Sequence, residues 1–293
     1  MAQFNKDTQT YIDGRRILHD VQMISNKNGD IVTTDNRFPV DAIVTAQIGE
    51  NYELQVAKGN ISGTVGLYKF GVNPDVNGTE EDIWSVGGTY SFATNASTRI
   101  VNSSSGSDVN STGTGAWQVY IEGLDENWEL ASETVDLNGT NNRTTSNQYR
   151  RVFRAYVITA GTSGTAAGTI SIRQTAGGTI MAQIPVGDNQ TLMNIYTVPA
   201  GKTLYLTNVT LSSGATPGNG QATDHSIFKM KIRPFGGVFR TQLQKHTIET
   251  IDDNYNIPLV VTEKSDIVMS AQMVGTANVQ VSGIFQGYLV DDQ

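Results

Sequence analysis

The chain has 293 residues, no cysteine and a formal net charge of −8 at pH 7. The lack of cysteine excludes a disulfide framework, thiolate metal sites and cysteine catalysis, and the acidic balance argues against a nucleic-acid partner. Gly, Asn, Ser and Thr supply 30, 23, 20 and 34 residues, while charged residues make up 16%. This composition favours short strands joined by turns over long helices.

The first 40 residues are mostly polar, with Ile17, Val21 and Ile24 as apolar exceptions before an Asn28-Gly29-Asp30 turn. We predict an N-terminal arm or hairpin over residues 1–40. Met1–Asp7 shows no basic region followed by an apolar one, so we expect no secretory signal. No apolar run approaches about 18 residues, so we expect no membrane insertion.

Residues 41–176 show repeated strand patterns and are predicted to form a first β-sandwich domain. The pattern is clearest at Trp117–Glu122, where Trp, Val and Ile alternate with polar residues. Further strands are predicted at 52–56, 65–67, 90–92, 150–160 and 169–173. A short helix is a candidate at Thr79–Ser85, because Thr79 is a suitable N-cap. Residues 102–115 are predicted to be a surface loop too polar to pack.

Residues 177–293 are predicted to form a second β-sandwich that resembles a jelly roll. Its expected strands are 179–184, 192–198, 204–211, 227–232, 238–243, 267–274 and 279–290. Turns are marked by Val198-Pro199-Ala200-Gly201, by residues 212–220 and by Asn256-Ile257-Pro258. The predicted fold is therefore all-β, with two sandwich domains and an extended N-terminal arm.

Charge is unevenly distributed along the chain. Residues 71–137 contain eleven acids and one base, whereas residues 138–187 contain five arginines and no acid. The two stretches either neutralise each other within one sheet, or bind head to tail between copies, since complementary charge sets register and partner choice. For the second alternative the predicted contacts are Arg150, Arg151 and Arg154 against Glu80, Glu81 and Asp82.

Motifs for enzyme chemistry are lacking, and we predict that the protein is not an enzyme. The three histidines do not have metal-protease spacing, and there is no Gly-x-Ser-x-Gly nucleophile elbow. Glu122, Asp125, Glu126 and Glu129 lie near Trp117 and Trp128, which is the composition of a glycoside hydrolase site. Acids in a Gly123–Asn127 turn explain the same residues without catalysis.

No cofactor is expected, and a structural Ca²⁺ is the one metal for which the sequence offers ligands. Asp75, Asn77, Thr79 and Glu81 present oxygen atoms at alternate positions, as calcium loops do, but the glycine and terminal glutamate of an EF-hand are missing. A solvated acidic turn is the alternative interpretation.

Several strings resemble virion structural proteins of marine tailed phages of the cyanophage and pelagiphage kind. They are the opening Met1–Tyr11, Lys69-Phe70-Gly71, Glu81–Trp84, Gly87–Tyr90, Gly123-Leu124-Asp125, Ser132–Thr140 and Tyr196–Lys202. These strings span most of the chain, and none is a catalytic motif. The resemblance implies a place in the virus particle and carries over no functional residue.

We therefore expect a structural component of a tailed-phage virion, a tail, neck or fibre-associated protein assembled in the host cytoplasm. It would act by protein–protein assembly with itself, as a symmetric trimer or hexamer, and with other virion proteins. The alternatives are a head decoration protein and a receptor-binding module that contacts host-surface glycan through Trp84 and Trp128.

Overall fold

The computed structural model describes residues 10–12, 15–17, 51–214, 225–275 and 278–292. The chain divides into two units, Met1–Glu50 and Asn51–Gln293. In the first unit, β1 (Thr10–Ile12) pairs antiparallel with β2 (Arg15–Ile17). The rest of the predicted N-terminal arm lies outside the described residues.

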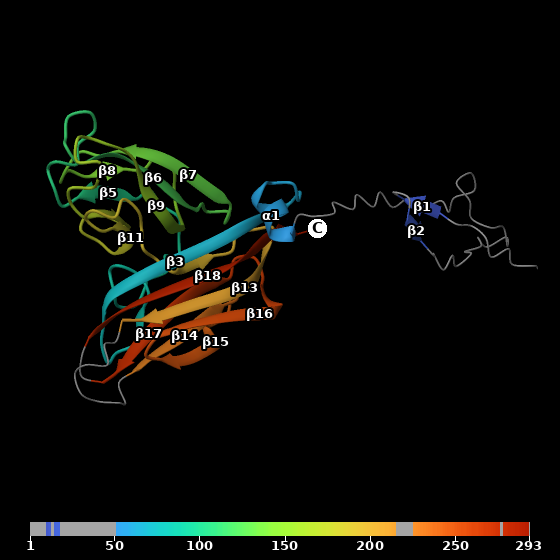
Figure 1. Cartoon of the computed structure of the whole chain (residues 1–293). Coiled ribbons are helices and arrows are strands. Elements are labelled where there is room, and N and C mark those ends of the chain that lie inside the picture. The colour runs from blue at the N-terminus through green and yellow to red at the C-terminus, as the bar shows by residue number, and fades with distance from the viewer. Residues whose placement is uncertain (1–9, 13–14, 18–50, 215–224, 276–277, 293) are drawn as a thin grey trace, which may run out of the picture. The chain divides into compact units, whose positions relative to one another are not determined.

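The second unit is all-β and contains two groups of antiparallel sheets (Figure 1). We name the first group the terminal lobe, because its strands come from both ends of this unit. One of its sheets has the order β16 (Thr250–Val261), β13 (Lys202–Ser213), β18 (Val279–Asp291), β3 (Thr64–Val76). The other has the order β12 (Ile195–Thr197), β17 (Asp266–Val274), β14 (His225–Arg233), β15 (Arg240–Thr247), and β4 (Glu81–Asp82) also pairs with β17.

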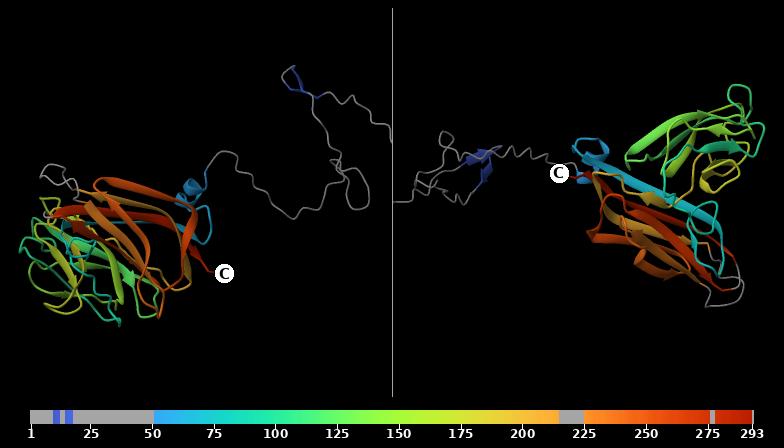
Figure 2. Two further views of the ribbon diagram at one scale, coloured as in Figure 1. Left: turned by 90° about the horizontal axis from the view of Figure 1, so that it is seen from below. Right: turned by 180° about the vertical axis from the view of Figure 1, so that it is seen from behind.

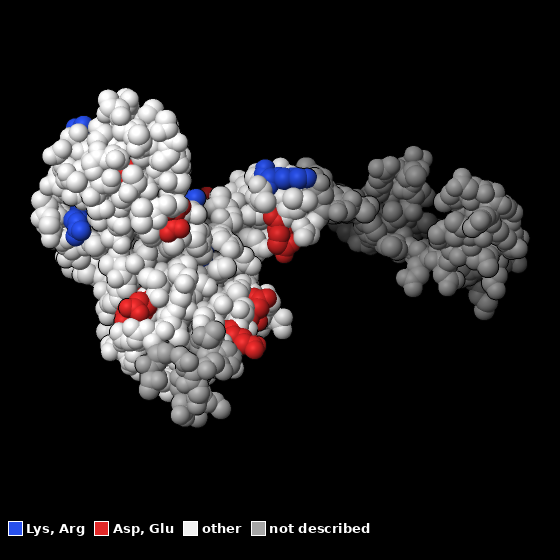
Figure 3. Space-filling view, turned by 60° about the vertical axis from the view of Figure 1, so that its left-hand side comes forward, with Lys and Arg blue, Asp and Glu red and all other residues white. Residues whose placement is uncertain are grey.

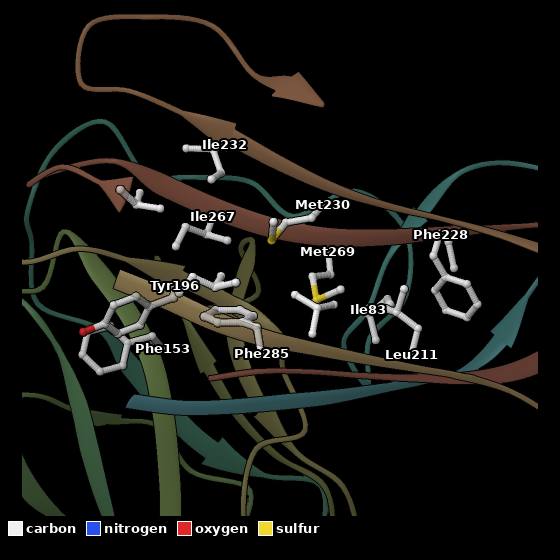
Figure 4. Close-up of a cluster of buried hydrophobic side chains, with 14 of the residues drawn as sticks. Ile83, Phe153, Tyr196, Leu211, Phe228, Met230, Ile232, Ile267, Met269 and Phe285 are labelled. Carbon is white, nitrogen blue, oxygen red and sulfur yellow. The ribbon is translucent and has the colours of Figure 1, made fainter. Parts of the chain in front are cut away.

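Alternation of apolar and polar residues builds the core of this lobe. On β14, Phe228, Met230 and Ile232 are buried while the residues between them are partly exposed. They belong to one cluster with Phe285 of β18 and Leu211 of β13, which come from the other sheet (Figure 4). The apolar faces of both sheets therefore share a single core.

The second group, named the inserted lobe, is formed by strands that lie between β4 and β12 in the chain. One sheet has the order β11 (Ile180–Ile184), β10 (Ile170–Arg173), β5 (Ile100–Ser103), β8 (Arg143–Thr144). The other has the order β7 (Leu130–Asp136), β6 (Ala116–Leu124), β9 (Arg151–Ala160). Both views in Figure 2 show this green and yellow lobe next to the orange and red strands of the terminal lobe.

The two lobes are packed together rather than joined by a linker. Leu124 and Phe153 of the inserted lobe belong to the core of the terminal lobe. Conversely, Ile195 of β12 and Val268 of β17 belong to the core of the inserted lobe. The chain from Asn51 onward is consequently one compact unit.

The strand pairing does not follow the predicted division after residue 176. The hairpin of β10 and β11 spans that position. β3 and β4, which lie in the predicted first domain, pair with β18 and β17 of the predicted second domain. One lobe is therefore inserted in the chain of the other, an arrangement that local patterns do not reveal because the pairing joins residues about 200 positions apart.

Three predicted elements differ from the structure. Tyr52–Ala57 forms the helix α1 instead of a strand, because the Asn51 side chain caps it by accepting a hydrogen bond from the Leu54 N–H. Thr79–Ser85 is not helical and contributes β4 instead. Asn256-Ile257-Pro258 lies within β16, where the missing proline N–H is tolerated because β16 is an edge strand.

The predicted strand at 90–92 is absent, and the 102–115 segment is better packed than predicted. Asp108 is fully buried and accepts hydrogen bonds from the Ser103 hydroxyl and from the N–H groups of Ala116, Ala167 and Gly168. This carboxylate joins its own loop to the loop between β9 and β10 and to the adjacent ends of β5 and β6. Among the described residues, no helix is long and apolar enough to cross a membrane.

Candidate interaction surfaces

The three predicted acidic contacts are held by partners within the terminal lobe. Glu80 accepts hydrogen bonds from Lys229 and Lys231 at 2.6 Å each and from Ser270 at 2.8 Å. Partial burial raises the pKa of Glu80, but these hydrogen bonds outweigh it and lower the pKa to about 2.

The neighbouring acids are also engaged. Asp82 is 4% exposed and accepts a hydrogen bond from the Tyr90 N–H. Its burial raises its pKa to about 6. Glu81 accepts hydrogen bonds from Asn73, Asn77 and the Gly88 N–H. All three carboxylates serve the folding of their own chain.

The three predicted arginines are likewise held within their own chain. Arg150 donates to the Thr94 carbonyl. Arg151 forms an ion pair with Asp266, and Arg154 lies 3.6 Å from Glu122 on the paired strand. The last pair is neutralisation within one sheet, as one of the two interpretations of the charge asymmetry expected. Among the described residues, no ion pair joins these arginines to Glu80, Glu81 or Asp82.

Neither predicted glycan contact presents a free ring face. Trp84 is 4% exposed, and its indole N–H donates to the Gly87 carbonyl. Trp128 is partly buried, and its ring lies 4.7 Å from Arg150 Cζ and 5.6 Å from the Phe235 centroid. Sugar stacking needs an accessible aromatic face. Trp84 has none, and the ring of Trp128 is largely covered by Arg150 and Phe235.

Trp128 belongs to a junction cluster between the lobes, defined here as Phe92, Trp128, Arg151, Arg233 and Asp266. The Arg151 Cζ lies 5.1 Å from the Phe92 ring centroid and 5.0 Å from that of Trp128. Asp266 Oδ1 is 3.0 Å from Arg151 Nε, and Asp266 Oδ2 is 2.5 Å from Arg233 Nη2. Arg151 comes from the inserted lobe and Asp266 from the terminal lobe, so a buried charge network joins them.

A groove lies on another part of the boundary between the lobes, with a volume of about 530 Å³. One wall is the first part of β3, residues 65–69, and the other is formed by β6, β7 and β9. β3 is an edge strand, and within the described chain no strand pairs with it on the side away from β18. The groove is therefore bordered by backbone N–H and C=O groups that lack a neighbouring strand.

The groove also leaves apolar side chains uncovered. Val65 is directly opposite Leu289 in the sheet, so both side chains point to the same face. Leu289 is 4% exposed and belongs to the core, whereas Val65 is 53% exposed. Leu130 on the facing wall is 59% exposed. The core of the terminal lobe is thus incompletely covered at this end of β3.

Lys69 lies at the end of the groove and is 7% exposed. Its ammonium donates to the Phe153 carbonyl and lies 5.9 Å from the Phe153 ring centroid. Within the described residues Lys69 has no carboxylate at ion-pair distance. Burial, together with the charge of Arg154, lowers its pKa to about 7, while Glu122 opposes the shift. The sequence analysis did not identify Lys69. The available signal was its position, because Lys69 continues the alternation of Val65 and Leu67 and so falls on the apolar face of the strand.

The opposite face of the same sheet is rich in tyrosine. Tyr205 is directly opposite both Val260 and Tyr288, on the face away from the core residues Leu204 and Leu206. We define the tyrosine face as Tyr52, Tyr68, Tyr205, Val260 and Tyr288. Tyr68, Tyr52 and Val260 are 58%, 48% and 55% exposed. On the side of the molecule seen in Figure 3, charged side chains are scattered, with wide uncharged areas between them.

The candidate calcium ligands have other roles. Asn77 hydrogen-bonds to Glu81 and to the Thr79 N–H, and Asp75 accepts from Asn278. The described residues contain no group of three or more His, Asp or Glu side chains arranged to hold a metal ion. The calcium site stays a prediction.

No model of a known protein family matches the sequence, and no curated protein matches it either. Among solved structures, that of infectious bursal disease virus strain Gx is similar at 9% identity, over 78% of this chain and 72% of that one, with a TM-score of 0.21. The Gt strain structure is 8% identical over 79% and 78% of the two chains, with a TM-score of 0.15. These scores are too low for the likeness to support a fold or a function.

Proposed function

We propose that this protein is a structural component of a tailed-phage virion, in the tail, neck or fibre region, that acts by protein–protein assembly. The carrying observation is the tyrosine face, a sheet surface with exposed aromatic rings. Tyrosine is enriched at protein interfaces, and exposed apolar patches of this kind mark contact sites. The resemblance of several sequence strings to virion proteins of marine tailed phages supports the proposed location in the virus particle.

The proposed architecture is a β-sandwich for each lobe, jelly-roll-like in the terminal lobe. The proposed assembly is a symmetric trimer or hexamer in which the tyrosine face contacts a neighbouring copy. We expect Tyr205→Glu to shift the full chain toward monomer in sedimentation velocity. Val238→Glu is the matched control, because Val238 is 72% exposed but lies outside the tyrosine face. Equal sedimentation of both variants and the parent chain would remove the tyrosine face from assembly.

Quantitative peptide mass spectrometry of gradient-purified particles tests the place in the virion. A few copies per particle support the tail, neck or fibre assignment. A copy number near that of the major shell protein supports the head decoration alternative instead, and absence from particles contradicts both. The glycan-binding alternative has no specific support, since Trp84 is buried and the Trp128 ring contacts Arg150 and, in a T-shaped arrangement, Phe235.

A further inference from the structure

We infer that the groove beside β3 binds an extended strand of another virion protein, with an acidic side chain that meets Lys69. The inference rests on the proposed function for the source of that strand and deepens it by naming the contact. Four observations on the groove support it: a free sheet edge, uncovered core residues, a buried cation and the local charge balance.

The free edge selects an extended polypeptide. Residues 65–69 of β3 line the groove, and five residues of strand extend over about 17 Å. An added strand satisfies the exposed N–H and C=O groups of such an edge, which is the basis of β-strand addition. All other pairings of β3 and its sheet are antiparallel, so we assign the added strand the same direction.

The uncovered side chains select apolar residues on the added strand. Val65 and Leu67 point toward the core face of the sheet, and Val65 is left 53% exposed there. Leu130 on the opposite wall is 59% exposed. Side chains of an added strand opposite Leu67 and Val65 would cover this end of the core, and burial of this apolar surface favours binding.

The buried cation selects a carboxylate. Lys69 and Arg154 supply two positive charges to the groove and Glu122 supplies one negative charge, a net of +1 when Lys69 is protonated. Glu122 already lies 3.6 Å from Arg154, which leaves the Lys69 ammonium with the Phe153 carbonyl as its acceptor. A buried ammonium without a carboxylate is costly, and one acidic side chain compensates it.

Alternation then fixes the spacing of the partner strand. Val65, Leu67 and Lys69 lie on one face, so the residues opposite them are two positions apart. In the antiparallel direction the residue opposite Lys69 comes first. The expected pattern is acidic, any residue, apolar, any residue, apolar. A glycan lacks both the backbone pairing and this spacing.

The test uses the full chain and a designed fluorescent peptide, acetyl-Thr-Asp-Thr-Val-Thr-Val-Thr-amide, in a fluorescence anisotropy titration. We expect saturable binding that weakens at least tenfold when the peptide Asp is replaced by Asn. In Lys69→Met the preference for Asp over Asn should vanish, because the coupling between the two charges is lost. Val65→Asp should weaken binding at least tenfold, whereas Val238→Asp should leave it unchanged.

The pH dependence gives a second readout. The pKa of Lys69 is about 7 in the free protein, so the affinity should be constant below pH 7 and fall at least tenfold between pH 7 and pH 9. The other titratable groups that line the groove are Glu122, Arg154 and the tyrosines 68, 120 and 196. Lys69→Met removes the Lys69 ammonium and keeps all of these groups, so this variant should abolish the dependence if Lys69 is its source.

Absence of saturable binding up to millimolar peptide, or an unchanged Asp preference in Lys69→Met, would overturn the inference. Binding of oligosaccharides that competes with the peptide, or self-association lost in Val65→Asp, would assign the groove to glycan or to a second copy and also overturn it. Tyr68 borders both surfaces, but the substituted residues Val65 and Lys69 lie outside the tyrosine face and Tyr205 lies outside the groove. The peptide titrations and the sedimentation and copy-number measurements can therefore fail or succeed separately.

Discussion

The junction cluster and the groove are two places where the lobes meet, and each contains a buried cationic side chain. The cation has a carboxylate partner in the junction cluster but not in the groove. In the junction cluster, Arg151 Nε lies 3.0 Å from Asp266 Oδ1, and Arg151 Cζ lies 5.1 and 5.0 Å from the ring centroids of Phe92 and Trp128. In the groove, Lys69 is equally buried but has a carbonyl as its hydrogen-bond acceptor. The first arrangement joins the lobes, whereas the second lowers stability and leaves a charge available to a partner.

The largest expected effect is in the junction cluster. Asp266→Asn keeps the shape of the side chain but leaves Arg151 and Arg233 without their anion. Removing one partner of a buried ion pair costs about 3–5 kcal/mol in the free energy of unfolding. Equilibrium denaturation in urea measures it. Asp292→Asn, at an exposed carboxylate, is the control, and a similar small loss in both variants would show that the network does not stabilise the chain.

Lys69→Met should have the opposite sign and increase stability at pH 7. Replacing a buried ion pair by apolar side chains of similar volume is often neutral or stabilises by about 1–4 kcal/mol, and we expect a stabilisation within this range when the unpaired Lys69 ammonium is removed. The pKa of Lys69 falls from its ordinary 10.5 to about 7 on folding, so parent-chain stability should rise with pH between these values. The advantage of Lys69→Met, measured by denaturation at pH 7 and pH 10, should therefore shrink. A constant advantage would mean that Lys69 stays charged.

Substitutions of Trp128 should reveal backbone strain at this position of the junction cluster. Its φ of 66° lies in the left-handed region, which costs a non-glycine residue about 1–2 kcal/mol. Trp128→Gly and Trp128→Ala both lose the ring, but only Gly relieves the strain. We expect the Gly variant to be more stable than the Ala variant by about 1 kcal/mol in thermal denaturation. At Trp117, which has no positive φ, the order of Gly and Ala should be reversed.

Glu80 is a partly exposed counterpart to Asp266, with three donors around its carboxylate. Its pKa falls from 4.5 to about 2 on folding, so its contribution is present above pH 4.5 and lost as the pH falls to 2. Because the group is partly in solvent, we expect Glu80→Gln to cost only about 1 kcal/mol at pH 7. Denaturation at pH 3 and pH 7 should show the cost shrinking at the lower pH, and a pH-independent cost would contradict the ion-pair origin.

The smallest effect is expected for Arg154→Ala. Its side chain is 51% exposed and lies 3.6 Å from Glu122. Exposed pairs contribute about 0.2–1 kcal/mol. Denaturation of Arg154→Ala, Glu122→Ala and the double variant should give a coupling energy within that range. A larger coupling would mean that the groove wall is less hydrated than its exposure indicates.

The sequence pattern predicted strands well where one face is buried. On β14 every second residue is buried, and the predicted 227–232 lies within the observed His225–Arg233. It failed on β16, where residues 250–260 are all exposed or only partly buried, so no buried face marks the strand. It also failed at α1, where the short alternation of Tyr52–Val56 fits a strand but Asn51 caps a helix.

The sites were less predictable than the strands, for a physical reason. Arg151 and Asp266 are separated by 115 residues, so nothing local indicates that they pair. The position of β3 beside β18 likewise decides whether Lys69 is buried. The charge asymmetry did reflect one local contact, since Glu122 and Arg154 face each other in the register of β6 and β9.

The connection between the lobes has a consequence for sequence variation. Ser85 N–H donates to the Leu192 carbonyl and Asn194 N–H to the Ile83 carbonyl, so the chain leaves the terminal lobe and returns to it at hydrogen-bonded neighbouring residues. Because the two ends of the inserted segment are adjacent, the outer loops of the inserted lobe can change in length without moving the strands of the terminal lobe. Leu124, Arg151 and Phe153 contact the terminal lobe, so they limit this variation to loops away from the junction between the lobes.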